Sequence, residues 1–460
     1  MGLNDPRGLA TSSEKSECIE ILERALGETL GIWGDPVATL DEALEIDPTF
    51  VMGHVFRAEM QLTAMERSLL PSVARDIELA EALTGNANER ERLHIAAARA
   101  WLEGDIDDAR NRYEEILLRY PLDLCALSTV HMADFYMGNS VEMRDRVARA
   151  RRAWHEDLPG YGYVLGIHAF GMEECGDYSA AEDLARRAVE INPRDTYAIH
   201  AVAHIMEMCG RQRDGITWMM DRKDDWAGSN FAIHLWWHTA LYHLDLGEID
   251  KVLEIYDTGV RNKRSDISLE ELDAAAMLWR LNLIGVDIEN RWKELADKWE
   301  PSAEDTHYAF NDMHAMMTFA GDGRDTAAAR LLAAGASYVT ERGKTNRRMT
   351  KEVGMPICRA ILAFSRSDYE TAVDLLVPVR YKSAVFGGSN AQRDIISLTL
   401  IESALRAKRY ELAHALLAER IALKPTSPAN WKAMARALDG NNNVKGAQSA
   451  WARAEQLAAA

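Results

Sequence analysis

The sequence predicts an all-α fold in which pairs of helices stack into a solenoid. Short turns led by glycine recur at Gly104, Gly138, Gly176 and Gly210 and continue to Gly321, with spacings between 34 and 38 residues. An amphipathic helical stretch precedes each turn and another follows it. No alternating β-rich segment of useful length is present. Since a repeat of this length built from two helices is typical of an α-α solenoid, we expect about ten or more helix pairs.

One repeat shows the pattern most clearly, and it reads GYVLGIHAFGMEECGDYSAAEDLARRAVEINPRD. Its second half, from Gly176 to Pro193, resembles the tetratricopeptide repeat pattern, and the stretch from Asp35 to Pro48 ends in the same way. The resemblance implies a tetratricopeptide-like right-handed α-superhelix. We expect residues 17–460 to form a single helical-repeat domain of this kind. Residues 1–16, rich in Gly, Ser and charge, are expected to form a flexible N-terminal arm.

The composition excludes several classes of protein. The chain is 47% hydrophobic and 27% charged, and its net charge of −19 argues against nucleic acid or an anionic membrane as the main partner. Five cysteines, an odd number without any CxxC pair, favour reduced thiols over a disulfide framework. The N-terminus has no apolar secretory region, and no run of apolar residues reaches membrane-spanning length. We therefore expect a cytoplasmic protein.

The first helices of the predicted pairs carry polar residues at helical spacing, whereas the second helices carry ordinary surface charges. In such arrays the first helix usually lines the concave face. We therefore predict a central pocket, lined by first helices between residues 121 and 406. The polar positions in these helices are His131 and Asp134, Tyr163 and His168, His200, His204 and Glu207, His234 and His238, Asp273 and Arg280, His307, Asn311 and His314, and Glu352 and Arg359.

The segment from His200 to His243 concentrates these residues, and three interpretations of it stay open. His200, His204, His234 and His238 could bind a metal, although Ala201 stands where the glutamate of HExxH would be. Alternatively, the same side chains could line a pocket for acid–base chemistry, or they could satisfy one another in a polar core. Apart from this metal, the sequence predicts no cofactor.

A second candidate element begins at a glycine pair, Gly387-Gly388, followed by Ser389-Asn390-Ala391-Gln392-Arg393-Asp394. Ser389 and Gln392 match the S-x-x-Q capping box, which predicts a helix N-terminus. Free backbone N–H groups and the positive end of the helix would suit an anion, and Arg393 would strengthen the attraction. The alternative is an ordinary helix start with a surface arginine.

The chain resembles the tetratricopeptide repeat protein 38 family over roughly Ala43 to Pro428. The motifs that carry the resemblance are HAVAHIMEMCGRQRDGITWM, HLWWHTALYHLDLGEIDKVLEIYD, FNDMHAMM and GGSNAQRD. The resemblance implies a helical superhelix without an established general reaction. One departure stands out: Asn390 replaces a histidine of the family motif. If this position transfers protons in relatives, this chain would bind a ligand without reacting or act on another substrate, because asparagine can form hydrogen bonds but cannot titrate.

Together these patterns predict a pocket for a small polar or anionic molecule, with hydrolase or lyase activity as an open question. His204 and His238 would transfer protons and Glu207 would orient them. The alternative is a scaffold that binds a peptide or a basic protein partner on its concave face; the sequence leaves the oligomeric state open. The residues expected to bind the ligand are His131, His168, His200, His234, Trp237, Asp273, Arg280, His307, Asn311, His314, Glu352, Ser389, Asn390 and Arg393.

Overall fold

The computed structural model describes residues 2–262, 267–340 and 345–459. This part of the chain forms 26 α-helices and five short 3-10 or π-helical segments. Its only extended pairing is an isolated bridge between Asn4 and Ala10. The predicted all-α fold is therefore confirmed. Within the same residues, none of the helices combines the length and the apolar character that a membrane span requires.

The contacts divide the chain into two compact units, whereas the sequence predicts one domain. The first unit contains residues 2–202, 224–231 and 345–346. The second contains residues 203–223, 232–262, 267–340 and 347–459. Helix α11 changes unit between Val202 and Ala203, so His200 is described with the first unit, and His204, His234 and His238 with the second.

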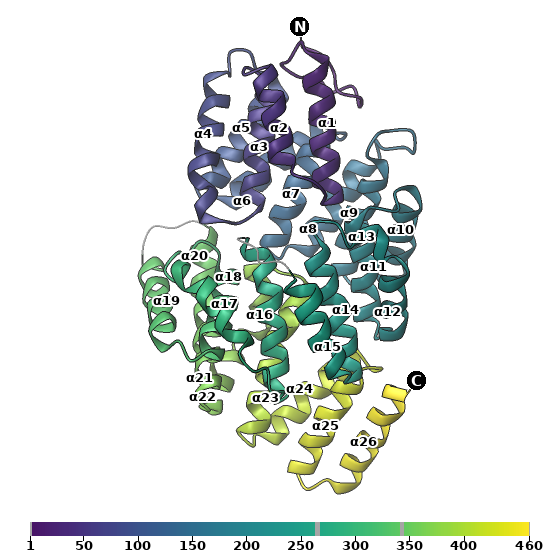
Figure 1. Ribbon diagram of the computed structural model, residues 1–460, viewed down its shortest axis with the longest axis vertical. Helices are drawn as coiled ribbons and strands as arrows, with labels where there is room; N and C mark the ends of the chain where they lie inside the picture. Colours follow the sequence, from purple (N-terminus) through teal and green to yellow (C-terminus); the bar gives the residue numbers. More distant parts are fainter. Residues whose placement is uncertain (1, 263–266, 341–344, 460) are drawn as a thin grey trace. The chain divides into compact units, whose positions relative to one another are not determined.

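In the first unit consecutive helices pack as antiparallel neighbours: α1 on α2, α3 on α4, α5 on α6, α7 on α8 and α9 on α10. First helices also touch one another, as α3 does with α5 and α7. Figure 1 shows α3 to α6 side by side in the purple and blue part of the chain. The elements are α1(Ser16–Gly31), α2(Pro36–Ile46), α3(Val51–Thr63), η1(Arg67–Leu69), α4(Leu70–Ala82), α5(Glu89–Leu102), α6(Ile106–Arg119), α7(Leu124–Tyr136), α8(Ser140–Arg151), α9(Tyr161–Glu174), α10(Tyr178–Ile191) and the first half of α11(Thr196–Met208).

The second unit repeats the pairing with α14 on α15, α16 on α17, α18 on α19, α21 on α22, α23 on α24 and α25 on α26. Its first helices α14, α16, α18 and α21 contact one another in sequence order, and α23 also packs on α16. The elements, including two that cross the unit boundary, are α12(Gln212–Asp221), α13(Lys223–Trp226), α14(Ala232–Leu246), α15(Ile249–Ile255), η2(Tyr256–Val260), α16(Ser268–Leu283), α17(Arg291–Trp299), η3(Glu300–Ser302), α18(Ala309–Gly321), α19(Asp325–Tyr338), α20(Thr345–Met349), η4(Thr350–Gly354), α21(Met355–Ser365), α22(Tyr369–Leu376), η5(Arg380–Phe386), α23(Asn390–Arg406), α24(Tyr410–Leu423), α25(Pro428–Gly440) and α26(Val444–Ala459).

The glycine turns explain why one helix stops and the next begins. Gly104 adopts a φ of 81°, in the left-handed region that ends a helix, and the side chain of Asp105 then accepts a hydrogen bond from the Asp108 N–H at the start of α6. One predicted turn is shifted: α18 ends at Gly321, and the left-handed residue is Gly323, with a φ of 69°. The helix pairs thus follow the predicted repeat.

The segment before α1 packs on the first unit, where the sequence predicts a flexible arm. The Arg7 guanidinium is paired with Asp5 at 2.8 Å and with Glu23 at 2.5 Å, and its side chain is only 2% exposed. The Ser12 N–H donates to Glu91 at 2.7 Å. The charged and small residues of this segment are typical of a solvated arm. The structure instead neutralises the charge of Arg7 with a carboxylate close in sequence and another on α1, and this pairing allows the side chain to be buried.

Candidate functional site

Three histidines and two carboxylates of the second unit meet where α11, α14 and α16 adjoin. His234 Nδ1 lies 2.7 Å from Asp273 Oδ2, and His238 Nδ1 lies 3.2 Å from Glu207 Oε2. The Nε2 atoms of His234 and His238 are 3.2 Å apart, and the ring of His204 lies 4.4 Å from that of His238. The i, i+4 spacing on α14 places its two rings on one face, and the neighbouring helices supply the carboxylates.

This cluster is buried, so its electrostatics differ from those of surface histidines. His204 and His238 are 0% exposed. Burial, together with the neighbouring rings and the charge of Arg280, holds the pKa of His238 well below its usual value. The ring of His238 is therefore neutral at physiological pH and offers a lone pair rather than a charge.

Arg280, on α16, is the unusual cation of this region. It is 4% exposed and donates to the carbonyl oxygens of Ala276 at 3.3 Å and Ala391 at 2.9 Å, while its guanidinium lies 5.2 Å from the ring centre of Trp237. In the described part of the chain it forms no ion pair with a carboxylate. Burial lowers the pKa of Arg280, and the more distant carboxylates only partly oppose this effect.

Polar atoms on neighbouring first helices are buried without a hydrogen-bond partner in the described residues. They are Trp237 Nε1 on α14, Asp273 Oδ1 on α16, and Asn311 Oδ1 and His314 Nε2 on α18. The Nδ1–H of His314 donates to the carbonyl of Phe310, which leaves Nε2 as an acceptor, and burial lowers the pKa of this ring to about 4. Buried polar groups are nearly always hydrogen-bonded, so these atoms suggest contact with a ligand or water.

A cavity of about 450 Å³ in the second unit reaches this cluster. Glu207 and Arg280 belong both to its lining and to the polar cluster. Most lining charges are neutralised locally: the Arg420 guanidinium pairs with Asp394 and the Lys424 ammonium lies 3.4 Å from Glu207. Burial alone would raise the pKa of Asp394, but the charge and hydrogen bonds of Arg420 hold it well below its usual range. Arg280 is thus the buried lining charge that lacks a counter-charge at contact distance.

The helix that follows the glycine pair begins as the sequence predicts. Ser389 caps α23, and the reciprocal bonds with Gln392 complete the capping box. Arg393, however, does not face outward from the helix. Its guanidinium folds back on the carbonyl of Gly388 and lies 2.8 Å from Asn390 Oδ1. The Arg393 guanidinium and the N–H of Gln392, two of the groups expected to hold an anion, are therefore engaged by the loop itself.

Two predicted ligand-binding residues are wrongly placed by the sequence pattern. His307 does not share the helical face of Asn311 and His314, because Tyr308 has an extended backbone and α18 begins only at Ala309. Glu352 is exposed to solvent, on the outer side of the π-helical segment η4. Spacing alone could not locate these local breaks in the helix.

Three further predicted residues belong to the first unit, where each has local contacts. His131 Nε2 lies 2.7 Å from the hydroxyl of Tyr197, and His168 Nδ1 accepts from Arg151 at 3.0 Å. The His200 ring packs edge-on against Phe231, with ring centres 4.9 Å apart. These contacts give the first unit an aromatic and polar interior.

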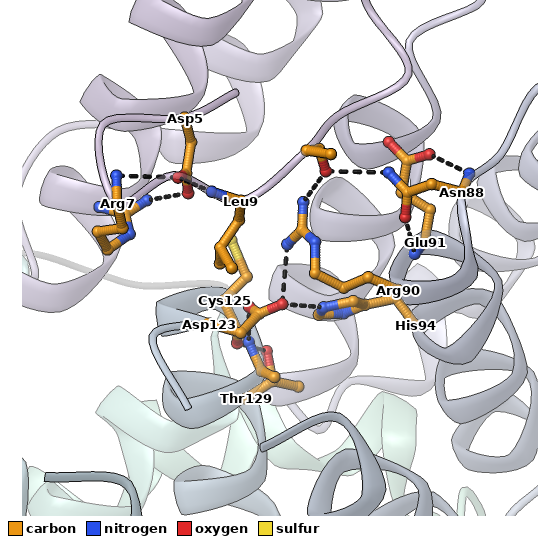
Figure 2. Close-up of polar contacts among 12 residues, drawn as sticks. Asp5, Arg7, Leu9, Asn88, Arg90, Glu91, His94, Asp123, Cys125 and Thr129 are labelled. Atoms are coloured by element: carbon orange, nitrogen blue, oxygen red, sulfur yellow. Dashed lines mark hydrogen bonds and ion pairs between the residues drawn. The ribbon is translucent and has the colours of Figure 1, made fainter. Parts of the chain in front are cut away.

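The first unit also contains a charged network that the sequence pattern missed. His94 Nδ1 lies 2.8 Å from Glu59 Oε1 and its Nε2 lies 3.0 Å from Asp123 Oδ2. Figure 2 shows the second contact, with Arg90 reaching the same carboxylate at 2.8 Å. The Tyr113 hydroxyl donates to Glu59 at 2.9 Å. The i, i+4 spacing of Arg90 and His94 could have indicated that the two side chains share a helical face. Their carboxylate partners come from α3 and the start of α7, which are far away in the sequence, so the spacing could not reveal the network.

Within the network, His94, Arg90 and Asp123 favour one another's ionised forms, whereas Glu59 differs. Burial lowers the pKa of His94, but the two carboxylates outweigh burial and raise the pKa to about 9. Burial would raise the pKa of Asp123, but His94 and Arg90 hold it well below its usual range. For Glu59 burial dominates and raises the pKa. Because every ring nitrogen and carboxylate has a partner, we interpret this network as a structural polar core.

The fold defines a class: the described part of the chain is an all-α protein whose helices pack in sequential pairs, and its second unit contains a buried cluster of histidines, carboxylates and Arg280. No protein-family model matches the chain. Among solved structures it is similar to human IFIT1 in a dimer with PPP-AAAA, at 12% identity and a TM-score of 0.42, covering 96% of this chain and 95% of that chain. It is also similar to a chain of Naa15/Naa10 bound to HypK-THB, at 12% identity and a TM-score of 0.24, covering 80% of this chain and 64% of that chain. The helix pairing defines the class, and membership of the tetratricopeptide repeat protein 38 family stays a prediction.

Proposed function

We propose that the protein is a helical-repeat scaffold whose second unit binds a small anionic molecule in the cavity beside Arg280. The supporting observation is the burial of this guanidinium at 4% exposure, where its partners among the described residues are carbonyl oxygens and an aromatic ring. Removing a charge from water without a counter-ion costs several kcal/mol, even in a relaxed site. A carboxylate or phosphate ligand would offset that cost.

The neighbouring polar atoms narrow the kind of ligand. The Trp237 N–H can donate to an oxygen of the anion, whereas Asp273 Oδ1 and His314 Nε2 can only accept, as long as the carboxylate is ionised and the ring is neutral. A matching ligand therefore carries an acidic group together with hydroxyl or amine donors. If the protein turns such a ligand over as a hydrolase or lyase and these rings bind no metal, His204 and His238 would transfer the protons.

The test measures binding of phosphate, pyrophosphate, succinate and serine by isothermal titration calorimetry. Arg280→Met should weaken the bound probe at least about tenfold, since a hydrogen bond to a charged group contributes about 1.5–3 kcal/mol. The matched control is Arg291→Met, which removes a partly exposed arginine paired with Asp257 in the same unit. Equal affinity in wild type and Arg280→Met, or equal weakening by both variants, would contradict the proposal.

A second candidate is a scaffold for a peptide or basic protein partner. Two observations favour it. Asp245 lines the cavity and accepts hydrogen bonds from Gln212 and Ser427 rather than pairing with a cation among the described residues. Trp451 on α26 lines the same cavity while 42% exposed. In that case Trp451→Ala should abolish binding of fluorescent lysine-rich peptides, measured by polarisation, while Arg280→Met leaves it unchanged. The reverse pattern, or no peptide binding at all, would reject the scaffold.

A further inference from the structure

The imidazole pair on α14 has an arrangement that hydrogen bonding between two neutral rings does not explain. His234 Nδ1 is 2.7 Å from Asp273 and His238 Nδ1 is 3.2 Å from Glu207. An ionised carboxylate can only accept a hydrogen bond, so both Nδ1 atoms carry the ring hydrogen. The Nε2 atoms then present lone pairs, and these two atoms face each other at 3.2 Å.

Two facing acceptors repel unless a cation lies within reach of both. Zinc bound by imidazole nitrogens at about 2.0–2.1 Å in tetrahedral geometry places two ligand nitrogens about 3.3–3.4 Å apart. The separation of 3.2 Å between the Nε2 atoms of His234 and His238 is close to this value. A third ring is available, because a nitrogen of His204 lies within 4.8 Å of the ligand nitrogens of the other two.

We propose that His204, His234 and His238 form a zinc-binding site in the second unit, with Asp273 and Glu207 as the carboxylates that orient the rings. Carboxylates that accept from the second ring nitrogen are the usual outer partners of metal-bound histidines. A site of three imidazoles selects zinc or a similar transition metal rather than magnesium or calcium, which prefer oxygen ligands.

The surrounding charges fit a metal that acts on an anion. Asp273 and Glu207 oppose the charge of the ion, although Glu207 also contacts Lys424 at 3.4 Å. With Arg280 nearby, the occupied site would carry an excess of positive charge. A fourth ligand would complete the tetrahedral coordination of zinc. The proposal goes beyond anion binding and does not depend on it.

The experiment measures zinc in the full-length protein, purified without chelators and dialysed against metal-free buffer, by inductively coupled plasma mass spectrometry. We expect about one equivalent in wild type and less than about a tenth of an equivalent in His204→Gln and His238→Gln. Asp273→Asn should weaken zinc affinity about 10–100-fold, as loss of an outer partner does. The matched control is His243→Gln, which changes a histidine of the same helix that pairs with Glu248 instead.

A second measurement guards against variants that misfold. Chelator-treated protein is titrated with Co²⁺, whose visible absorption is intense only in four-coordinate sites, and circular dichroism is recorded on the same samples. Wild type and His243→Gln should give the band, and folded His238→Gln should not. Sub-stoichiometric zinc and no cobalt band in folded wild type would overturn the proposal and leave a proton shared between the rings. Binding of phosphate or succinate is also measured on the chelated protein. If it survives removal of the metal, the anion site does not require the metal site, and the two proposals can be judged independently.

Discussion

Replacing His94 by phenylalanine keeps an aromatic ring on α5 but removes both nitrogens from the buried network of the first unit. In the native protein these nitrogens lie 2.8 Å from Glu59 and 3.0 Å from Asp123, and all three side chains are at most 1% exposed. After the substitution Asp123 retains Arg90 as counter-charge. Glu59 retains the hydroxyl of Tyr113 as its closest donor and no cation.

We expect the substitution to destabilise the first unit, because the Glu59 carboxylate stays buried after its cationic partner is removed. Removing one partner of a buried ion pair costs about 3–5 kcal/mol, because the other charge stays buried without compensation. Adding Glu59→Gln removes the charge, so the double variant should regain about 2 kcal/mol relative to the sum of the single changes. The control His155→Phe changes a histidine whose side chain is 63% exposed, and it should cost less than about 0.5 kcal/mol.

Hydrogen exchange of the α5 amides is the appropriate assay, because it reports opening of the first unit even if the two units unfold in separate steps.

The same assay tests how the stability of the first unit depends on pH. The folded pKa of His94 is about 9, above the ordinary 6.5, so its contribution is complete below pH 6.5 and is lost as pH rises through 9. At about 1.4 kcal/mol per pH unit this amounts to about 3 kcal/mol. A loss below about 1 kcal/mol in His94→Phe, or an unchanged pH dependence, would refute the reasoning.

Three other substitutions test the fold. Gly388→Ala should destabilise the second unit by about 2–4 kcal/mol in urea unfolding, because the residue has a φ of 77° and a new Cβ would lie 2.5 Å from Phe310. Lys408→Gly should stabilise the same unit by about 1 kcal/mol, since Lys408 occupies a left-handed turn with a φ of 59°. Arg7→Met should release the N-terminal segment by stranding Asp5 and Glu23, which mass spectrometry would detect as faster trypsin cleavage after Lys15. Cleavage at the wild-type rate would contradict the last expectation.

The sequence could predict the position of a site residue where that residue lies on a regular helix. The i, i+4 spacing of His234 and His238 and the i, i+7 spacing of Asp273 and Arg280 describe residues on regular helices, and the structure keeps these spacings. His307 fails because the chain is extended immediately before α18. The spacing analysis does not identify His94, because its partners Glu59 and Asp123 come from other parts of the sequence and a pattern within one helix does not report them.

The sequence by itself determined the all-α class, the length of the repeat and the turns, because these depend on local periodicity and on glycine in left-handed turns. It also placed polar residues on the first helices. Only the tertiary structure decided which of them meet: Arg280 is buried without a carboxylate, whereas Arg393 is engaged by its own loop. Burial and counter-charges depend on neighbouring helices, and these same quantities separate the candidate ligand site around Arg280 from the structural network around His94.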